Sequence, residues 1–326
     1  MPPTLPLVQF KEQKKIGKNL DQFDAEPISK KLGIFLSSHP ACIKLFQYLV
    51  KTRGFAETEY VVAFLRDWYK KAKFKSFVVE RKCTSCGLSS FQSLAEVNFN
   101  ESRRKRDDPC PKCRTSRYIV EEEQKEFQRR DIWSIYLYGW RLGIFSPVHY
   151  AVCPFCKYEQ DLGKIKKRVN KLFCIKCKKP ADVVLCFRIH KKIMESMDIA
   201  NAHGYWFEWY VTYLIKTSGK NIDVKRNQVF TVDGKEAEID AVLEKNKQRI
   251  LLNCSAETDG TFDVEKFHVC NRVGNKIILA TPNDTIKSNV VESAENAFPD
   301  GVYVKVISSL SDLLFGVTFS KPTKRN

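Results

Sequence analysis

The sequence predicts a multidomain chain of the α+β and α/β classes, in which two small cysteine-rich units with helical elements precede a mixed-sheet domain of order αβββαβ. Three observations predict this. The chain has 326 residues, more than one hydrophobic core usually organises. Eight of its twelve cysteines form two regularly spaced quartets in the first 180 residues. From about residue 187 onward, helical and strand patterns alternate.

The first 78 residues divide into a polar segment and two helical patterns. Residues 1–30 contain prolines and the run KEQKK, so we expect a flexible N-terminal arm. Apolar residues then recur at three- and four-residue steps over 41–54 and 57–73, which predicts two helices with a break at Gly54. Residues 31–78 are therefore expected to form a helical region, either a small cap or docking hairpin or a helix-turn-helix.

The two cysteine quartets have the spacing of metal ligands. Paired CxxC turns present four thiolates to one ion, which suits a closed tetrahedral zinc site. A cytosolic chain keeps its thiols reduced, which argues against disulfides. We expect two zinc ribbons, over 79–120 and 148–185, each holding one structural Zn²⁺; an iron–sulfur cluster or a redox-active CxxC are the alternatives. The expected ligands are Cys83, Cys86, Cys110 and Cys113, and Cys153, Cys156, Cys174 and Cys177.

The formal net charge of +17 comes from the N-terminal half. Residues 1–180 hold 36 Lys+Arg and 19 Asp+Glu, whereas residues 181–326 hold 19 of each. Such a field attracts polyanions, of which nucleic acid, DNA or RNA, is favoured over an anionic membrane surface; a charge-rich surface of the thermophile kind is the alternative. Each ribbon has a basic segment between its CxxC turns, and the candidates for phosphate contact, or else for a solvated loop, are Arg103, Arg104, Lys105, Arg106, Lys164, Lys166, Lys167 and Arg168.

A connecting helix is predicted between the ribbons, over residues 121–147. Its pattern begins acidic and becomes aromatic, which indicates an apolar stripe packed on a core. The alternative is a platform for base stacking made of Trp133, Tyr136, Tyr138 and Trp140. No apolar run approaches the length of a membrane span, and the N-terminus lacks the regions of a signal peptide, so a cytoplasmic protein is expected.

Residues 186–326 give the mixed-sheet domain. A helix over 202–219 ends at a glycine, and strands over 221–232 and 236–244 flank Asp233-Gly234, a strong hairpin signal. A strand over 249–255, a helix near 262–272, a strand over 276–281, a helix near 285–298 and a strand over 302–307 follow. Glu236, Glu238 and Asp240 alternate along one face of their strand.

Three positions resemble a known family. Glu208 lies in the helix "GYWFEWYVTYL", Asp240 in the strand "EIDAVL", and "LLNCSAE" forms the next strand. This order resembles the restriction-endonuclease-like PD-(D/E)xK superfamily, particularly its archaeal and bacterial Mrr-like branch, over residues 198–310. The resemblance implies a helix glutamate at Glu208 and a metal-binding aspartate at Asp240. It also implies that Asn253 and Ser255 stand where the family has the glutamate and lysine of E-x-K, and Cys254 between them is expected in the core.

These two departures weaken the case for an enzyme. Hydrolysis by the scheme of this family needs carboxylates that hold Mg²⁺ or Mn²⁺ and a lysine that stabilises developing charge. Asparagine removes a negative charge and serine supplies no cation, and losing one such donor costs about 10²- to 10³-fold. Glu257, with Lys266 or Lys216, is the candidate to take over these roles.

The sequence therefore supports three hypotheses. The first is a nucleic-acid-binding zinc-ribbon protein with an inactive nuclease-like domain, acting as an accessory or scaffold subunit in a defence, repair or transcription complex with a protein partner. The second is a Mg²⁺- or Mn²⁺-dependent nuclease with migrated catalytic residues, centred on Glu208, Asp240 and Glu257. The third is a protein-interaction adaptor whose basic surface is incidental.

Overall fold

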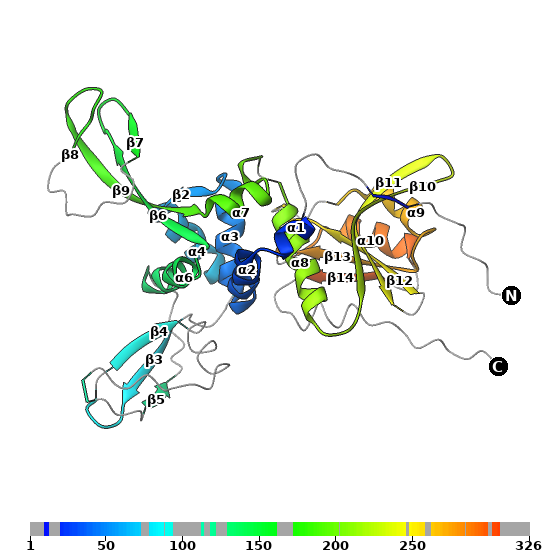
Figure 1. The fold of residues 1–326 in the computed structure, drawn as a ribbon, viewed down its shortest axis with the longest axis horizontal. Helices are drawn as coiled ribbons and strands as arrows, with labels where there is room; N and C mark the ends of the chain where they lie inside the picture. Colours follow the sequence, from blue (N-terminus) through cyan, green and yellow to red (C-terminus); the bar gives the residue numbers. More distant parts are fainter. Residues whose placement is uncertain are drawn as a thin grey trace. The chain divides into compact units, whose positions relative to one another are not determined.

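The computed structural model describes residues 10–12, 20–72, 78–87, 89–93, 112–113, 118–121, 129–161, 172–201, 203–245, 248–257, 262–283, 285–298 and 302–306. The chain divides into two compact units (Figure 1). We call residues 1–25 with 203–326 the sheet unit, and residues 26–202 the ribbon unit. Two of the six segments expected from the sequence, residues 1–30 and 186–326, are divided between these units. Each unit is described by itself.

The sheet unit contains a six-stranded mixed sheet of order β1-β10-β11-β12-β13-β14. The strands as far as β12 are antiparallel, and β12, β13 and β14 are parallel. The bounds are β1 (Phe10–Glu12), β10 (Asp223–Val232), β11 (Lys235–Lys245), β12 (Gln248–Cys254), β13 (Lys276–Thr281) and β14 (Val302–Val306). The helices are α1 (Leu20–Asp24), α8 (Tyr205–Thr217), η2 (Val264–Lys266), α9 (Phe267–Cys270) and α10 (Ser288–Ala297).

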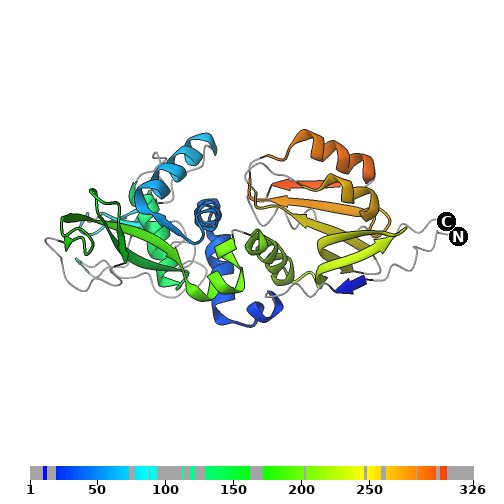
Figure 2. The same cartoon turned by 90° about the horizontal axis from the view of Figure 1, so that it is seen from above.

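The order of helices and strands expected for residues 202–307 is confirmed. Asp233 and Gly234 both have positive φ, at 50° and 76°, so they close the β10–β11 hairpin as a tight turn. Leu251 of β12 packs with α9 and α10 in one apolar core, and Figure 2 shows α10, in orange, along the sheet. Its neighbours Ile250 and Leu252 point to the opposite face, where α8 contacts β12. The sheet is therefore covered by helices on both faces.

The expected flexible arm over residues 1–30 is wrong for part of its length. Residues 10–12 form β1, which pairs with β10 at the sheet edge. Residues 20–24 form α1, whose Leu20 and Phe23 are buried, and Phe23 meets Trp209 of α8 edge to face at 5.2 Å. Leu20 and Phe23 have the i, i+3 spacing of one helix face, but two apolar residues are too few to indicate a helix, and they become a core only against α8.

Arg226 of β10 ties α1 to the sheet unit. Its side chain is 3% exposed, and its Nη1 donates to Asp21 Oδ1 at 2.7 Å and to Asp24 Oδ2 at 2.9 Å. Trp209 Nε1 donates to the same Asp24 at 2.8 Å. Burial by itself raises the pKa of Asp24, but the hydrogen bond and charge of Arg226, with Lys216 and Trp209, outweigh this and lower the pKa below 3.8.

The ribbon unit holds two further sheets and a helical layer. One sheet has the order β4-β3-β5, and the other has the order β2-β9-β6-β7 with β8 paired to β9. The strands are β2 (Phe55–Glu57), β3 (Val78–Cys83), β4 (Ser89–Ser93), β5 (Tyr118–Glu121), β6 (Phe145–Val152), β7 (Glu159–Asp161), β8 (Leu172–Phe173) and β9 (Pro180–Ile189). The helices are α2 (Pro27–Ser38), α3 (Pro40–Lys51), α4 (Thr58–Ala72), α6 (Arg129–Arg141), α7 (Lys191–Ser196) and η1 (Ile199–Asn201).

The two expected N-terminal helices are present as α3 and α4, and Gly54 separates them. Gly54 has φ 85°, and a Cβ there would clash with Met194, so the position requires glycine. The residues between the helices form β2, which pairs with β9. The helical region is thus joined to the second ribbon and is not an independent segment.

The expected helix over 121–147 differs at both ends. Glu121 belongs to β5, and α6 covers only Arg129–Arg141, because the chain turns at Gly143, which has φ 78°. Tyr136 and Tyr138 are buried, and Tyr136 lies 4.3 Å from Phe187 of β9 between ring centroids. These two rings therefore form core and not a base-stacking platform, whereas Trp140 is exposed.

Within the described residues, no helix combines the length and the apolar character that a bilayer crossing requires.

Removing the Arg226 guanidinium should loosen the sheet unit. Arg226→Met leaves the carboxylates of Asp21 and Asp24 without their central cation, and we expect a loss of about 2 to 4 kcal/mol in the free energy of unfolding. Urea unfolding, with hydrogen exchange of α1 and α8, measures this. The control is Lys225→Met, which removes an exposed ion pair to Glu244 and should cost under about 1 kcal/mol. Equal effects of the two variants would contradict the role of Arg226.

Candidate functional site

The second cysteine quartet is assembled by two turns of the same geometry. β6 leads into Cys153, and the short strand β8 leads into Cys174. Lys157 N–H donates to the Cys153 carbonyl at 2.9 Å, and Lys178 N–H donates to the Cys174 carbonyl at 2.8 Å. Both lysines have positive φ, at 55° and 59°. The strands thus position two matching CxxC turns with their sulfurs facing each other.

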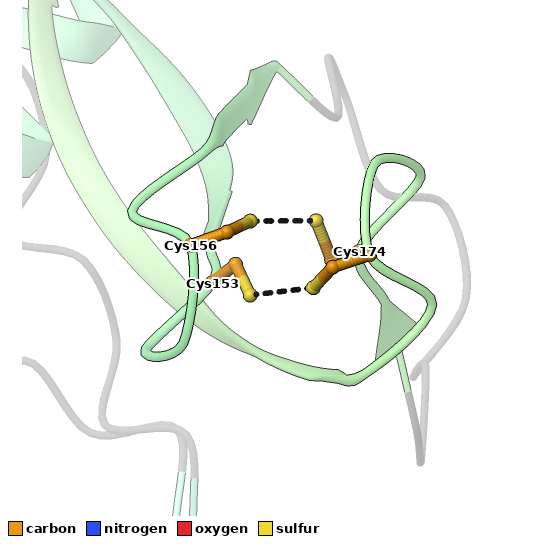
Figure 3. A group of neighbouring side chains, drawn as sticks. Cys153, Cys156 and Cys174 are labelled. Carbon is orange, nitrogen blue, oxygen red and sulfur yellow. Dashed lines mark hydrogen bonds between the residues drawn. The ribbon is translucent and has the colours of Figure 1, made fainter.

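The four sulfurs of this quartet lie at the separation of ligands to one ion. Cys153 Sγ is 3.3 Å from Cys177 Sγ, and Cys156 Sγ is 3.6 Å from Cys174 Sγ (Figure 3). All four ligand atoms lie within 4.8 Å of one another. Zinc–sulfur bonds of about 2.3 Å place tetrahedral sulfurs about 3.8 Å apart, whereas a disulfide requires about 2.05 Å. The distances fit a metal site and exclude a disulfide.

The surroundings of these sulfurs shift the pKa values of two neighbouring thiols in opposite directions. Desolvation raises the pKa of Cys153, but N–H donors from Cys156 and Phe155 and the thiol of Cys177 outweigh it and lower the pKa to about 6. The Tyr158 N–H lowers the pKa of Cys156, but desolvation and the neighbouring sulfurs raise it to about 12. Four adjacent thiolates repel one another, so a cation is needed to deprotonate the whole group.

The first quartet is described in three of its four members. Cys83 Sγ and Cys113 Sγ are 3.4 Å apart, and with Cys86 they form a group whose ligand atoms lie within 4.8 Å of one another. Gly87 N–H donates to the Cys83 carbonyl at 2.9 Å with φ 67°, the same turn as in the second quartet. Cys110 lies outside the described residues. The cysteine groups therefore fit metal binding, as expected, and suit structural zinc because all ligands are sulfur.

The basic segments expected to contact phosphate lie outside the residues that the structure describes. This holds for Arg103, Arg104, Lys105 and Arg106 in the first ribbon and for Lys164, Lys166, Lys167 and Arg168 in the second.

Two of the three candidate catalytic carboxylates approach the same thiol. Desolvation raises the pKa of Cys254 well above its usual value, and the charges of Asp240 and Glu208 raise it further. Asp240 Oδ2 accepts a hydrogen bond from the Cys254 backbone N–H at 2.6 Å. The described β11–β12 register runs from Lys245↔Gln248 to Ala241↔Leu252, so this contact lies one residue beyond the paired segment. Asp240 thereby bridges the point where the two strands part.

The positions that resemble E-x-K carry neither a carboxylate nor a cation. Asn253 is half-buried and pairs with Leu279 in the parallel ladder. Ser255 is buried, and its N–H donates to the Ala280 carbonyl at 2.9 Å. Glu257 is exposed, and its backbone carbonyl accepts a hydrogen bond from Asn283. The segment after β12 is thus anchored to the end of β13 through its backbone.

The two lysines considered as replacements are paired with other carboxylates. Lys216 Nζ lies 3.2 Å from Asp21 and 3.1 Å from Asp24. Lys266 Nζ lies 3.3 Å from Asp263. Among the described residues, the groups of three or more Cys, His, Asp or Glu ligand atoms within 4.8 Å are the two cysteine groups, so Glu208, Asp240 and Glu257 do not form one.

Sequence reasoning missed two features of these sites. Cys254 was expected to be only a core residue, but its N–H donates to Asp240, and the charges of Asp240 and Glu208 help to raise the pKa of its thiol. The exposed aromatic residues of the second ribbon, Phe155 and Phe173, were also missed. The signal for them is an aromatic residue inside or next to a CxxC turn, where the metal ligands and not an apolar core hold the chain.

Comparison with known proteins gives weak similarities only. No family model matches the chain, and no curated protein matches it. Among solved structures, the chain is similar to Can2 from Sulfobacillus thermosulfidooxidans in complex with cyclic tetra-adenylate, at 19% identity and a TM-score of 0.32, over 41% of this chain and 40% of Can2. It is similar to protein VC1899 from Vibrio cholerae at 10% identity and 0.36, over 95% of this chain and 56% of VC1899. Protein AF1548, of unknown function, gives 16% and 0.27, over 34% and 65%. TM-scores below 0.5 do not establish a common fold.

Loss of one ligand should remove one metal ion from the chain. Cys174→Ser leaves three thiolates in the second quartet, and we expect the zinc content of the purified protein to fall from two ions to one per chain. Mass spectrometry of the metal and zinc release to a chromogenic chelator measure this. The control is Cys186→Ala, a buried cysteine of β9 outside both quartets, which should keep both ions. Equal zinc in wild type and Cys174→Ser would contradict the assignment.

Proposed function

We propose that this chain is a nucleic-acid-binding protein with a nuclease-like domain that does not catalyse, and that it serves as an accessory or scaffold subunit of a nucleoprotein complex. Two structural zinc ribbons supply the electrostatic attraction. The single observation that carries the proposal is the division of charge, since the whole excess of +17 belongs to residues 1–180. A polyanion is the partner that such a field attracts most strongly.

The surroundings of Asp240 support the non-catalytic part of the proposal. One of its carboxylate oxygens accepts the Cys254 N–H, where it holds β12 to β11. Ser255 replaces the lysine that the resemblance calls for, and it is buried. Lys216 and Lys266 neutralise aspartates elsewhere. Asp240 thus has a structural role, and neither Lys216 nor Lys266 supplies the cation that hydrolysis requires.

Binding should depend steeply on salt. Full-length protein and labelled single-stranded or duplex DNA and RNA, followed by fluorescence anisotropy, should give an affinity that falls by orders of magnitude between about 50 and 200 mM salt. Alanine at Lys164, Lys166, Lys167 and Arg168 together should lower the slope of log K against log salt by about 3 to 4 for a duplex.

The matched control replaces exposed lysines of the sheet unit, Lys235 and Lys287, and should leave the slope unchanged. The absence of salt-sensitive binding to all four nucleic acids would contradict the proposal. If the quadruple variant leaves the salt slope unchanged, the phosphate contacts lie outside the second ribbon.

A metal-dependent nuclease is the second candidate, because the charges of both Asp240 and Glu208 help to raise the pKa of the Cys254 thiol, and Asp240 also accepts the Cys254 N–H. Our proposal predicts no Mg²⁺- or Mn²⁺-dependent cleavage of single-stranded, duplex or branched DNA and RNA. Cleavage by wild type that Asp240→Ala abolishes would establish the second candidate instead. The double variant N253E/S255K restores the residues that the resemblance expects, so cleavage by this variant alone would assign the loss of activity to these two positions.

A further inference from the structure

The tip of the second ribbon exposes an unusual share of large apolar side chains. We define the ribbon tip as residues 153–158 and 173–179, the two CxxC turns with their flanking residues. Four of the seven exposed large apolar side chains found in the described part of the chain lie there: Phe155 at 60% exposure, Tyr158 at 37%, Phe173 at 54% and Ile175 at 52%. Apolar side chains gathered on a surface mark binding sites more often than single scattered ones.

Folding of the tip does not account for these side chains. The turns are held by backbone hydrogen bonds from Lys157 and Lys178 and by the four facing sulfurs. Elsewhere in the ribbon unit, Phe35, Phe145 and Phe187 are fully buried in the aromatic core. A metal-held turn has no need of an apolar side chain that faces solvent, so the aromatic rings of the tip are available to a partner.

The charge of the ribbon tip indicates the chemical class of its binding partner. Its thirteen residues include Lys157, Lys176, Lys178 and Lys179 and contain no Asp or Glu. All four lysines are exposed. Lys179 Nζ lies over the Phe155 ring, 4.5 Å from its centroid, so one face of the ring contacts a cation and the other remains for stacking. Apolar rings interleaved with lysines complement a ligand that joins flat apolar faces to regularly spaced negative charges.

We propose that the ribbon tip is a stacking platform for single-stranded nucleic acid, in which bases stack on Phe155 and Phe173 and the lysines contact phosphates. This rests on the proposed function and narrows it to a strand form and a contact surface. A duplex keeps its bases stacked on each other and offers only phosphates, whereas an unpaired strand offers both parts of the match. Sequence selectivity is not expected, because every base has an aromatic face.

The affinities for a single strand and for a duplex should respond differently to the loss of the two aromatic rings. With full-length protein and labelled oligonucleotides, F155A/F173A should weaken single-strand binding by about 5- to 100-fold for each base that stacks, and should change duplex binding by less than about threefold. F155W/F173W should restore single-strand affinity, because tryptophan retains a stacking face. K157A/K176A/K178A/K179A should instead lower the salt slope for single strands by about 0.7 for each phosphate that the lysines no longer neutralise.

The control is Tyr60→Ala, which removes an aromatic side chain of α4 that is 62% exposed in the same unit and should leave both affinities unchanged. Zinc content equal to wild type in every variant shows that the ribbon remains folded. Photo-crosslinking to a single strand carrying 5-iodouracil should map to Phe155, Tyr158 or Phe173, a readout that a merely structural role would not produce.

Two outcomes would overturn the inference while the proposed function stands. One is wild-type binding to nucleic acid that F155A/F173A leaves unchanged for single strands, or weakens equally for duplexes. The other is loss of a protein partner in F155A/F173A with nucleic-acid binding intact, which would assign the tip to a protein. Absence of nucleic-acid binding by the wild type would remove the proposed function itself, and the inference with it.

Discussion

The constraint on which the ribbon unit depends is the close approach of four sulfurs in a space that requires a cation. Sulfur pairs at 3.3 and 3.6 Å cannot all be thiolates without a metal ion between them. The two matching turns lie between strands: β6 ends at Val152, just before the first turn, and β9 begins at Pro180, after the second. A metal ion held by these four sulfurs would take the place of an apolar core at this end, which leaves the surrounding side chains available for binding.

The sheet unit uses charged side chains to hold chain segments together. Arg226 joins α1 to α8 and β10 through Asp21 and Asp24, and Asp240 joins β11 to β12 through the Cys254 N–H. A carboxylate that accepts a backbone N–H at a strand end is favoured in its charged form, and it contributes to the fold whether or not it binds a metal. The acidic residues that resemble a nuclease site can therefore persist as structural groups.

The two units thus contribute different properties to one protein. The sheet unit has the helix and strand order that resembles a nuclease, but Asn253 and Ser255 lack the charges on which the chemistry depends. The ribbon unit and the chain before it carry the positive field, and its tip adds exposed aromatic rings to that field. Electrostatic attraction supplies affinity without sequence information, which suits a subunit that holds nucleic acid while another component selects or processes it.

Local sequence patterns determined much of the secondary structure and the candidate metal ligands of this protein. The CxxC spacing, the alternation of strands and helices over 202–307 and the Asp233-Gly234 hairpin all depend on neighbours a few residues apart, and the structure contains each of them. Tertiary structure alone decided that residues 20–24 pack on α8 and that Lys216 forms ion pairs with Asp21 and Asp24. Arg226 and Asp21 are separated by 205 residues. No periodicity encodes a contact of that range, because only the folded core brings the two side chains together.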